Sequence, residues 1–574
     1  MRKSEVKDGL ALRAIAGCHV VILAWSMPKE ACEGCMGFAI HRTDHTEDEA
    51  YWMQGIKTFA ETDPGFVAGS LYATNKHPIQ GFTWSDFSAK PGHRYTYKVQ
   101  ALKGAPTSLT PYKETSVAID TEDESGDGHN IYFNRGAAAS QEYVRRFGKV
   151  PPDENDGADP RWAWLSRGAM ESIENFVARA ANAQFGLRVC AYEFRLDLFA
   201  DLLKEAKNRG ADIRILYDGG ANRPDKNGKV FPRDENRETA LAGKVKSLCK
   251  ERVTRDDVKD PPIAHNKFIV LTKNNKAVAA LTGSTNFSRG GVFGQSNVIH
   301  IVEDDAIAAD YLGLWNTLEG NPDHGDLRAD LSARNNIPAG LPPKGASTIF
   351  SPQTDLSALD WYAARAKAAP NALFMTFAFG MNDLFKDVYR TGAAGLRYAL
   401  MDKLIPSGTR KEKRPAAIAE MIKIRKRKEN RFAVGSAIRV NTFDRWLPEI
   451  LTGLNTHVQY IHTKFMLIDP LGDDPIVITG SANFSDASTD ENDENMLVIR
   501  GDKRVADIYV GEYMRLWNHY AFREWAESEA GKLKAGEKIE ERKFKHLDAE
   551  SKWWKPYFGD TDKSRQRAYF AGVA

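Results

Sequence analysis

The chain has 574 residues, a length that allows three or four domains with several independent cores. Hydrophobic residues make up 42% of it and charged residues 27%, which is ordinary globular usage and excludes a disordered, collagen-like or coiled-coil protein. The 79 Lys and Arg residues nearly balance the 77 Asp and Glu residues, so the formal net charge is only +2. Total charge therefore does not mark the chain as a nucleic-acid binder, and any basic surface must be local.

Cysteine content and apolar runs bear on the compartment. The chain has 5 cysteines, too few for a disulfide framework in this length, which favours a reducing environment. Cys32 and Cys35 have zinc-knuckle spacing, but no second ligand pair is near, so a turn with two small apolar side chains is favoured. The run 18–25 is too short to span a bilayer and no cleavage site follows it. We expect no transmembrane segment and a cytoplasmic protein, or one exported without a cleaved signal peptide.

Residues 1–122 predict an all-β sandwich. Short apolar or alternating segments bounded by turns are expected as strands at 20–25, 37–42, 95–102 and 117–119. The alternating strand Y-x-Y-x-V-x-A after Pro91-Gly92 resembles the fibronectin type III pattern. Trp25, Trp84 and Phe87 are expected in the sandwich core rather than on a ligand platform. The sequence identifies no protein partner for this domain.

Beyond a polar, acidic segment at 123–160, expected as a linker, apolar strands alternate with helices, which is typical of an α/β fold. A repeat is visible when the two parts are aligned. Strand, helix and strand at 188–194, 198–208 and 212–218 are echoed at 373–379, 383–389 and 396–402. Two similar α/β halves are therefore predicted at 161–340 and 345–530, joined near 336–347 and followed by a C-terminal extension at 531–574.

Each half carries the same composite motif. His265-Asn266-Lys267 precedes an apolar run, and Gly283-Ser284-Thr285-Asn286 begins eighteen residues after the histidine. His462-Thr463-Lys464 is followed at the same spacing by Gly480-Ser481-Ala482-Asn483. H-x-K alone is a weak signal, but two composite matches with identical spacing are very improbable by chance. The repeat therefore outweighs the alternative that each histidine is a core or capping residue.

The residue types suit phosphoryl chemistry. In a strand, the His and Lys of H-x-K lie on one face, so both can reach one ligand. Lys and Asn can hold non-bridging phosphoryl oxygens, while a His attacks phosphorus or moves a proton. Two such sets facing each other supply a nucleophile and an acid without a metal or other cofactor. The residues alone do not distinguish attack by His from activation of water.

These motifs resemble the signature of the phospholipase D superfamily, H-x-K-x-x-x-x-D followed by Gly-Ser-x-Asn, usually present twice in a chain. The resemblance covers about residues 160–525. It implies a pseudo-twofold α/β fold with one active site between the halves. It also implies a phosphohistidine intermediate, formed when one His displaces the leaving alcohol and resolved when water or another alcohol attacks.

The two copies differ where the family has acidic residues. Asp469 matches the family's Asp, whereas Thr272 stands at that position in the first half. Phosphodiesterase relatives that act on tyrosyl-DNA adducts also lack this Asp and remain active, so both halves are expected to function. The family's acidic residue that orients a catalytic His matches Glu494, and the first half has Gln295-Ser296-Asn297 instead.

This asymmetry suggests separate roles for the two histidines. A carboxylate raises the pKa of a neighbouring imidazole, whereas Gln or Ser only fixes its tautomer. Pairing within each half predicts His462 beside Glu494 as the general acid and His265 as the nucleophile, which agrees with the family's usual assignment. The alternative is that Glu494 makes His462 the stronger nucleophile.

The expected site contains no metal ligands and has three groups of residues. The catalytic group is His265, Lys267, Asn286, His462, Lys464, Asn483, Glu494 and Asp469. The supporting group is Ser284, Ser481, Gln295, Ser296 and Thr272. The substrate-binding group, from a basic insertion at 410–431, is Arg410, Lys411, Arg425, Lys426 and Arg427.

Three functions remain open, because superfamily chemistry serves several substrates. The first is hydrolysis of a phospholipid headgroup, favoured by the complete second motif and by the aromatic-basic stretch 552–558, which could contact a membrane surface or dock on the core. The second is a nuclease, favoured by the basic insertion, which a solvated helix at 416–428 would also explain. The third is a non-catalytic phosphate-binding protein.

Overall fold

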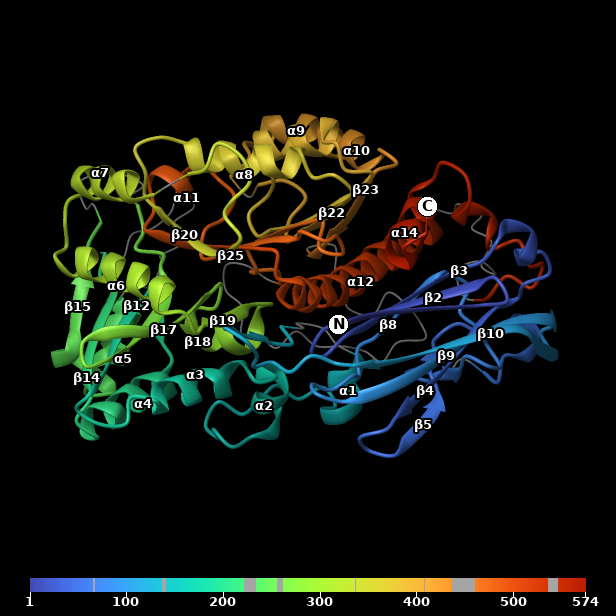
Figure 1. Cartoon of the computed structure of the whole chain (residues 1–574), viewed down its shortest axis with the longest axis horizontal. Coiled ribbons are helices and arrows are strands. Elements are labelled where there is room, and N and C mark those ends of the chain that lie inside the picture. Colours follow the sequence, from blue (N-terminus) through green and yellow to red (C-terminus); the bar gives the residue numbers. More distant parts are fainter. Residues whose placement is uncertain are drawn as a thin grey trace.

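The computed structural model describes residues 1–65, 68–136, 141–220, 234–254, 262–335, 337–406, 408–435, 460–534 and 546–573. An N-terminal sandwich lies at one end of the molecule, and two α/β halves are stacked at the other (Figure 1). The predicted mixed α/β architecture with an all-β N-terminal part is confirmed. No helix in these ranges has the length and hydropathy needed to cross a bilayer.

The sandwich consists of two antiparallel four-stranded sheets. The first has the order β1(Arg2–Lys7), β2(Leu10–Ala16), β3(Val21–Ser26) and β8(Thr83–Asp86), and the second β10(Ser108–Asp120), β9(Arg94–Ala105), β4(Gly37–Asp44) and β5(Glu49–Trp52). A small hairpin pairs β6(Gln54–Gly55) with β7(Tyr72–Ala73). Alternate residues of β9 are buried, as the Y-x-Y-x-V pattern requires. The fibronectin type III likeness stays a prediction.

The sandwich core contains Trp25, Cys32 and Cys35, and Trp84 packs against it. Phe87, by contrast, is exposed, so its prediction as a core residue was wrong. Phe87 directly follows Asp86, the last and buried residue of β8, and successive side chains of a strand point to opposite faces. All 5 cysteines are free.

Each α/β half has a seven-stranded sheet with the same strand order. The first sheet is β11(His129–Phe133), β19(Val298–Val302), β17(Lys276–Gly283), β16(Lys267–Lys273), β12(Phe185–Ala191), β14(Asp212–Asp218) and β15(Cys249–Arg252). The second is β20(Gly345–Ser351), β26(Glu494–Arg500), β25(Ile476–Gly480), β24(Phe465–Ile468), β21(Ala372–Phe377), β22(Leu396–Met401) and β23(Asn430–Val434). The internal repeat inferred from the sequence is therefore a repeat of topology.

Helices cover both faces of the two sheets. In the first half these are α1(Gln141–Phe147), α2(Pro160–Ser166), α3(Ala169–Ala178), α4(Asp197–Asn208), α5(Asp234–Ala242), α6(Asp305–Glu319) and α7(His324–Arg334). In the second half they are α8(Ser357–Lys367), α9(Asp383–Thr391), α10(Arg414–Arg425), α11(Ala487–Asp490), α12(Lys503–Lys534) and α14(Asp562–Ala571). One core joins both sheets through α6 and α12, represented by Phe268, Trp315, Phe465 and Tyr509. Because the sheets share this core, their strand ends are held in a fixed relation.

One segment differs from its predicted role, and another takes one of the two roles expected for it. The expected linker at 123–160 contains β11, which pairs with β19 as an edge strand of the first sheet. The aromatic stretch 552–558 packs on the sandwich, where Trp554 is buried and Trp553 Nε1 donates a hydrogen bond to the Cys35 carbonyl at 2.8 Å. Of its two proposed roles, docking on the core is the observed one. Asn336, at the start of the expected junction between the halves, lies outside the described residues.

Candidate active site

The two histidines come together because the segment around each one pairs with a segment of the other half. Isolated bridges join Ala264 to Asp493 and Ser296 to Ile461. The His462 amide donates to the Ser296 carbonyl at 3.2 Å. Each histidine therefore lies against the segment that precedes β19 or β26 of the other half, and neither half contains a complete site.

His265 is held by a carboxylate of the second half. Its Nδ1 lies 2.9 and 2.8 Å from the two carboxylate oxygens of Glu494. Ser481 Oγ donates to the same carboxylate at 2.6 Å. The Tyr192 ring packs against the imidazole with centroids 4.8 Å apart. Since Glu494 accepts the Nδ1 proton, Nε2 is the nitrogen left for a ligand.

His462 is held by an amide of the first half. Its Nδ1 lies 2.9 Å from Asn297 Oδ1, which also accepts from Ser284 Oγ at 2.9 Å. Asn297 Nδ2 donates to the Gly291 carbonyl at 2.8 Å, which identifies Oδ1 as the acceptor facing the imidazole. An amide oxygen fixes the tautomer without adding charge.

The expected pairing of His462 with Glu494 was therefore wrong, because each histidine takes its partner from the opposite half. Gln295 and Ser296 are not the counterparts of Glu494 either: Gln295 lines the cavity, and Ser296 Oγ donates to the Tyr460 carbonyl at 3.0 Å. The counterpart is Asn297, which stands fourteen residues after Gly283 as Glu494 stands fourteen after Gly480. Equal spacing was the signal that could have found it.

The lysines of the two motifs are equivalent. Lys267 Nζ donates to the His265 carbonyl at 2.6 Å, and Lys464 Nζ donates to the His462 carbonyl at 2.7 Å. Both lysines are buried. Burial lowers the pKa of Lys267 to about 8 and that of Lys464 well below its usual value, the latter also through repulsion from Lys267. Both lysines therefore gain from a nearby anion.

The Gly-Ser-x-Asn segments bring backbone and amides to the same place. A Cβ at Gly283 would lie 2.2 Å from the Val298 carbonyl oxygen, and one at Gly480 would lie 2.2 Å from the Asn495 carbonyl oxygen. Only glycine allows these approaches. Beyond them, Asn286 and Asn483 line the cavity, and the buried Oδ1 of each makes no hydrogen bond with the described residues. Their amides are thus open to a ligand.

Burial and positive charge keep both imidazoles neutral. The pKa of His265 is lowered well below its usual value by burial and by Lys267 and Lys464. The pKa of His462 is lowered for the same reasons. Burial raises the pKa of Glu494 to about 7. A phosphate anion placed between the lysines would offset their charge and make protonation of an imidazole easier.

The cavity at this site has a volume of about 760 Å³ and two unlike walls. The first half contributes Glu193, Arg195, Glu235 and Arg289, whereas the second half contributes Phe377, Phe379, Met381, Pro406 and Phe484. Arg195 lies 3.6 Å from Glu193 and 3.4 Å from Glu235, and Arg289 lies 2.8 Å from Glu154. The charged wall is therefore internally neutralised. The opposite wall is mainly apolar, and its carboxylate, Asp486, accepts a hydrogen bond from Asn382 Nδ2 at 2.8 Å. Sequence reasoning missed both walls; for Glu193 just after β12, and for Phe379 and Met381 just after β21, the available signal was their position beside the motif strands.

Asp469 and Thr272 lie away from the cavity, at the far ends of the motif strands. Asp469 accepts hydrogen bonds from the Asn371 side chain at 2.7 Å and the Ala372 amide at 2.8 Å. Thr272 Oγ1 donates to the Gly186 carbonyl at 3.3 Å. Asp469 lies seven positions after His462, with the four residues of β24 between them, which corresponds to roughly 20 Å in an extended chain. The expected catalytic role of Asp469 was wrong: it fixes the start of β21.

The basic insertion does not line the cavity. Arg425 pairs with Glu524 at 2.7 Å and Arg427 with Glu429 at 3.5 Å. Arg410, Lys411 and Lys426 are exposed. The insertion was predicted to bind substrate in the site, and the described cavity residues include none of these five.

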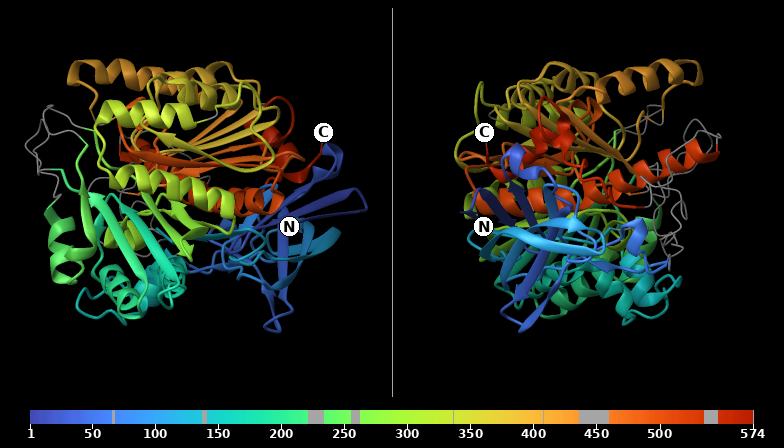
Figure 2. Two further views of the ribbon diagram at one scale, coloured as in Figure 1. Left: turned by 60° about the vertical axis from the view of Figure 1, so that its left-hand side comes forward. Right: turned by 90° about the vertical axis from the view of Figure 1, so that its right-hand side faces the viewer.

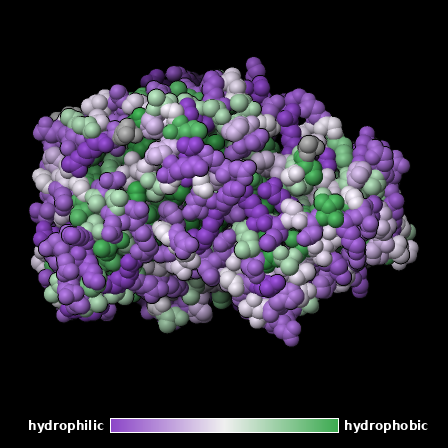
Figure 3. All heavy atoms as spheres, in the orientation of Figure 1, coloured by the Kyte–Doolittle hydropathy of each residue, from purple (hydrophilic) through white to green (hydrophobic). Residues whose placement is uncertain are grey.

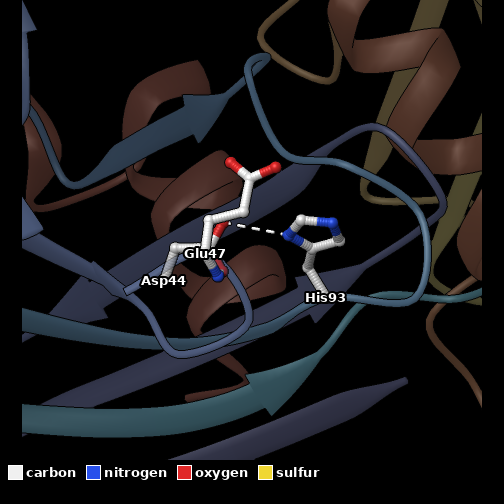
Figure 4. A group of neighbouring side chains, drawn as sticks. All are labelled: Asp44, Glu47 and His93. Carbon is white, nitrogen blue, oxygen red and sulfur yellow. Dashed lines mark hydrogen bonds and ion pairs between the residues drawn. The ribbon is translucent and has the colours of Figure 1, made fainter. Parts of the chain in front are cut away.

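One group of three possible metal ligands occurs in the described ranges, and it lies in the sandwich. Figure 4 shows Asp44, Glu47 and His93 beside one another. The Asp44 carboxylate already accepts from the Thr46 and Glu47 amides and lies 3.0 Å from His93 Nδ1. Glu47 pairs with Lys90, so its carboxylate already has a cation of the protein as its partner. The group is satisfied by the protein itself.

Comparison with known families matches both halves. The family described as "Cardiolipin synthase, PLD-like domain" matches residues 176–316 and 368–517, which together make up half of the chain. A phospholipase D of Rickettsia conorii is 26% identical over 148 residues, or 26% of this chain. The match spans 62% of that relative's own length.

Two solved structures show a similarity to this chain at low sequence identity. Phosphatidylserine synthase of Haemophilus influenzae is 12% identical with a TM-score of 0.43, covering 66% of this chain and 93% of its own. Yeast tyrosyl-DNA phosphodiesterase is 12% identical with a TM-score of 0.31, covering 56% of this chain and 84% of its own.

Proposed function

Because this chain belongs to the family of phospholipase D-like domains, we propose that it acts on a phosphodiester and cleaves a phospholipid headgroup through a phosphohistidine intermediate. The observation that carries the proposal is the crossed arrangement of His265 with Glu494 and His462 with Asn297 at one cavity. Two imidazoles with different partners can divide nucleophilic attack and proton transfer between them.

In the first step His265 Nε2 attacks phosphorus, and the bond from phosphorus to the leaving oxygen breaks. His462 Nε2 gives its proton to that oxygen, so the alcohol departs neutral. Glu494 stabilises the positive charge that forms on the phosphorylated imidazole. The buried ammonium groups of Lys267 and Lys464 stabilise the charge that develops on the non-bridging oxygens.

In the second step a water molecule attacks phosphorus from the side that the alcohol has left. His462 takes a proton from the water, the phosphorus–nitrogen bond breaks, and its electron pair returns to His265. The product is a phosphate monoester and both imidazoles are ready for another cycle. An alcohol in place of water would give a transfer product by the same steps.

The low pKa of His462 in the free protein does not conflict with its role as an acid. Burial and the two lysines disfavour its charged form. A bound phosphodiester carries one negative charge and would lie between these lysines, so substrate binding raises the pKa of His462. Proton uptake and substrate binding are thereby linked.

The cavity walls favour a lipid over a nucleic acid. The five apolar side chains of the second half offer contact area to the glycerol and acyl part of a lipid. The described ionised side chains of the wall, apart from the histidines, are three carboxylates and two guanidinium groups, and both guanidinium groups are paired. A polyanionic strand would gain little from such a wall. The nuclease and non-catalytic alternatives are therefore secondary.

The test is one assay with three substrates, each in the presence of EDTA: phosphatidylcholine vesicles, single-stranded DNA and double-stranded DNA. We expect release of the headgroup from vesicles and no cleavage of DNA. Cleavage of DNA alone would replace this proposal with the nuclease. No turnover of any of the three, nor of bis(p-nitrophenyl) phosphate, would support a non-catalytic protein.

A further inference from the structure

We propose that α10 and the segment before it form a docking surface for an anionic phospholipid bilayer. This α10 surface is defined by Arg410, Lys411, Lys413, Arg414, Ile418, Ile422, Lys423 and Lys426. The inference does not rest on the proposed reaction, because a surface can bind vesicles in the absence of turnover.

Two isoleucines of α10 project into solvent together. Ile418 is 38% and Ile422 is 43% exposed, and a spacing of four residues puts them on one face of the helix. Met421 and Ile424 are buried and fix the adjoining face of the helix to the second half. The face of the molecule in Figure 3 is mainly hydrophilic, with apolar residues in small groups. The two exposed isoleucines therefore form a small apolar patch on one face of α10.

Cations without ion pairs surround these isoleucines. Six lysines and arginines of the α10 surface are exposed and form no ion pair with the described residues: Arg410, Lys411, Lys413, Arg414, Lys423 and Lys426. Neighbouring cations behave differently, since Arg425 pairs with Glu524 and Arg431 with Asp562, each at 2.7 to 2.8 Å. Glu420, an acidic residue of α10, is bound to Lys386 of α9 at 2.9 Å and to Arg390. Against the six cations stands one exposed carboxylate of the described segment 410–426, Glu412. The surface is thus positive with an apolar centre, which complements anionic lipid headgroups over acyl chains.

The α10 surface lies on the half that forms the apolar cavity wall. Pro406 lines the cavity and precedes Arg410 by four residues. Asn382, the N-cap of α9, also lines it, and α9 contacts α10 through Glu420. Both views of Figure 2 show α10, in orange, along the upper edge of the molecule. Exposed Phe379 and Leu384 extend the apolar surface from the cavity wall toward α9. A bilayer bound here would adjoin the cavity.

Nucleic acid is the less suitable partner for this surface. A phosphate backbone would satisfy the cations but would leave Ile418 and Ile422 facing a polyanion with no apolar contact. A bilayer takes up both groups, the cations at the phosphates and the isoleucines at the acyl boundary. The aromatic stretch 552–558, the other segment considered for membrane contact, is docked on the sandwich.

The experiment is co-sedimentation of the full-length protein with vesicles of phosphatidylcholine alone or with about 30% phosphatidylglycerol. We expect binding to the anionic vesicles and weak binding to the neutral ones. The variant Lys411→Gln/Lys413→Gln/Arg414→Gln should lose about 100-fold in affinity, since each cation near the surface is worth roughly a factor of five. Ile418→Asp/Ile422→Asp should lose binding while keeping the thermal unfolding temperature.

The matched control is Leu198→Asp, which changes a similarly exposed leucine on α4 of the first half. It should bind anionic vesicles as the unchanged protein does. All variants should hydrolyse soluble bis(p-nitrophenyl) phosphate at the unchanged rate, because none lines the cavity. Vesicle binding unaffected by both α10 variants would overturn the inference. A second pair of results would also overturn it. If the charge variant lost binding to single-stranded DNA while the isoleucine variant still bound anionic vesicles normally, the surface would be a nucleic-acid site.

Discussion

The two halves of the molecule share a topology and differ at one position that decides the chemistry of each histidine. Glu494 of the second half holds His265, and Asn297 of the first half holds His462. The serines behind them are equivalent, since Ser481 donates to Glu494 and Ser284 donates to Asn297. The duplication therefore gives both histidines the same backbone and serine surroundings. The carboxylate beside His265 suits that imidazole to carry phosphate, and the amide beside His462 suits that imidazole to move a proton.

Removing either imidazole should have the largest effect. His265→Asn and His462→Asn should each lower turnover of phosphatidylcholine by about 10⁴-fold or more, because the two act as a unit. The matched control His45→Asn changes a histidine of the sandwich that contacts Thr96 and should leave turnover unchanged. Steady-state kinetics with unfolding curves checks this, and a folded single variant with near-normal turnover would contradict the two-histidine account.

Removing the charge of Glu494 tests the pair formed by Glu494 and His265. Glu494→Gln should lower turnover by about a thousandfold, since a neutral amide does not stabilise the positive charge that forms on the His265 imidazole. Glu491→Gln, three residues earlier, is the matched control, because its carboxylate is half exposed and lies 3.5 Å from His324. Equal, small effects of both variants would show that His265 does not depend on its carboxylate.

The pH dependence tests the charges that surround both histidines. With bis(p-nitrophenyl) phosphate, whose leaving group needs no protonation, kcat/KM should fall about tenfold per unit above pH 8, where Lys267 loses its proton. The acid limb should lie no higher than about pH 7, where Glu494 takes up a proton and loses its charge, because the lowered pKa of His265 keeps the attacking imidazole itself neutral. An acid limb above pH 7 would contradict the assignment of His265 as a buried, neutral nucleophile.

Making the halves alike should have the smallest effect. Asn297→Asp places a carboxylate beside His462 and should raise its pKa, which moves the alkaline limb of kcat for phosphatidylcholine up by about one unit. Asn297→Ala is the control, since it removes the acceptor without adding charge and should give no upward shift. The soluble p-nitrophenyl substrate should show no such shift with either variant. A shift seen with that substrate too would mean that Asn297 does not act through proton donation.

The sequence was sufficient for the architecture and for the two H-x-K pairs of the site, but not for the partners of the histidines or for the cavity walls. The repeat and the convergence of His265, Lys267, His462 and Lys464 follow from local patterns and equal spacing. The partner of each histidine depends on the register between strand ends of different halves, which no spacing within one half specifies. Asp469 illustrates the same limit: its place in the motif suggested chemistry, yet the length of β24 carries it out of the cavity.

The basic insertion shows a second limit of the sequence. Composition predicted α10 and its charge, which the structure bears out. It did not distinguish cations that face a cavity from cations that face solvent, because that depends on which helix face carries Met421 and Ile424 inward.

The most direct test of the central claim is to identify the phosphorylated residue. Labelled p-nitrophenyl phosphodiester is reacted briefly, quenched in alkali, and the phosphopeptide is sequenced. The account predicts label on His265 in the unchanged protein and in His462→Asn, which turns the intermediate over slowly, and none in His265→Asn. Label on His462 would contradict the account, and would mean that the imidazole beside Asn297 attacks phosphorus while the one beside Glu494 moves the proton.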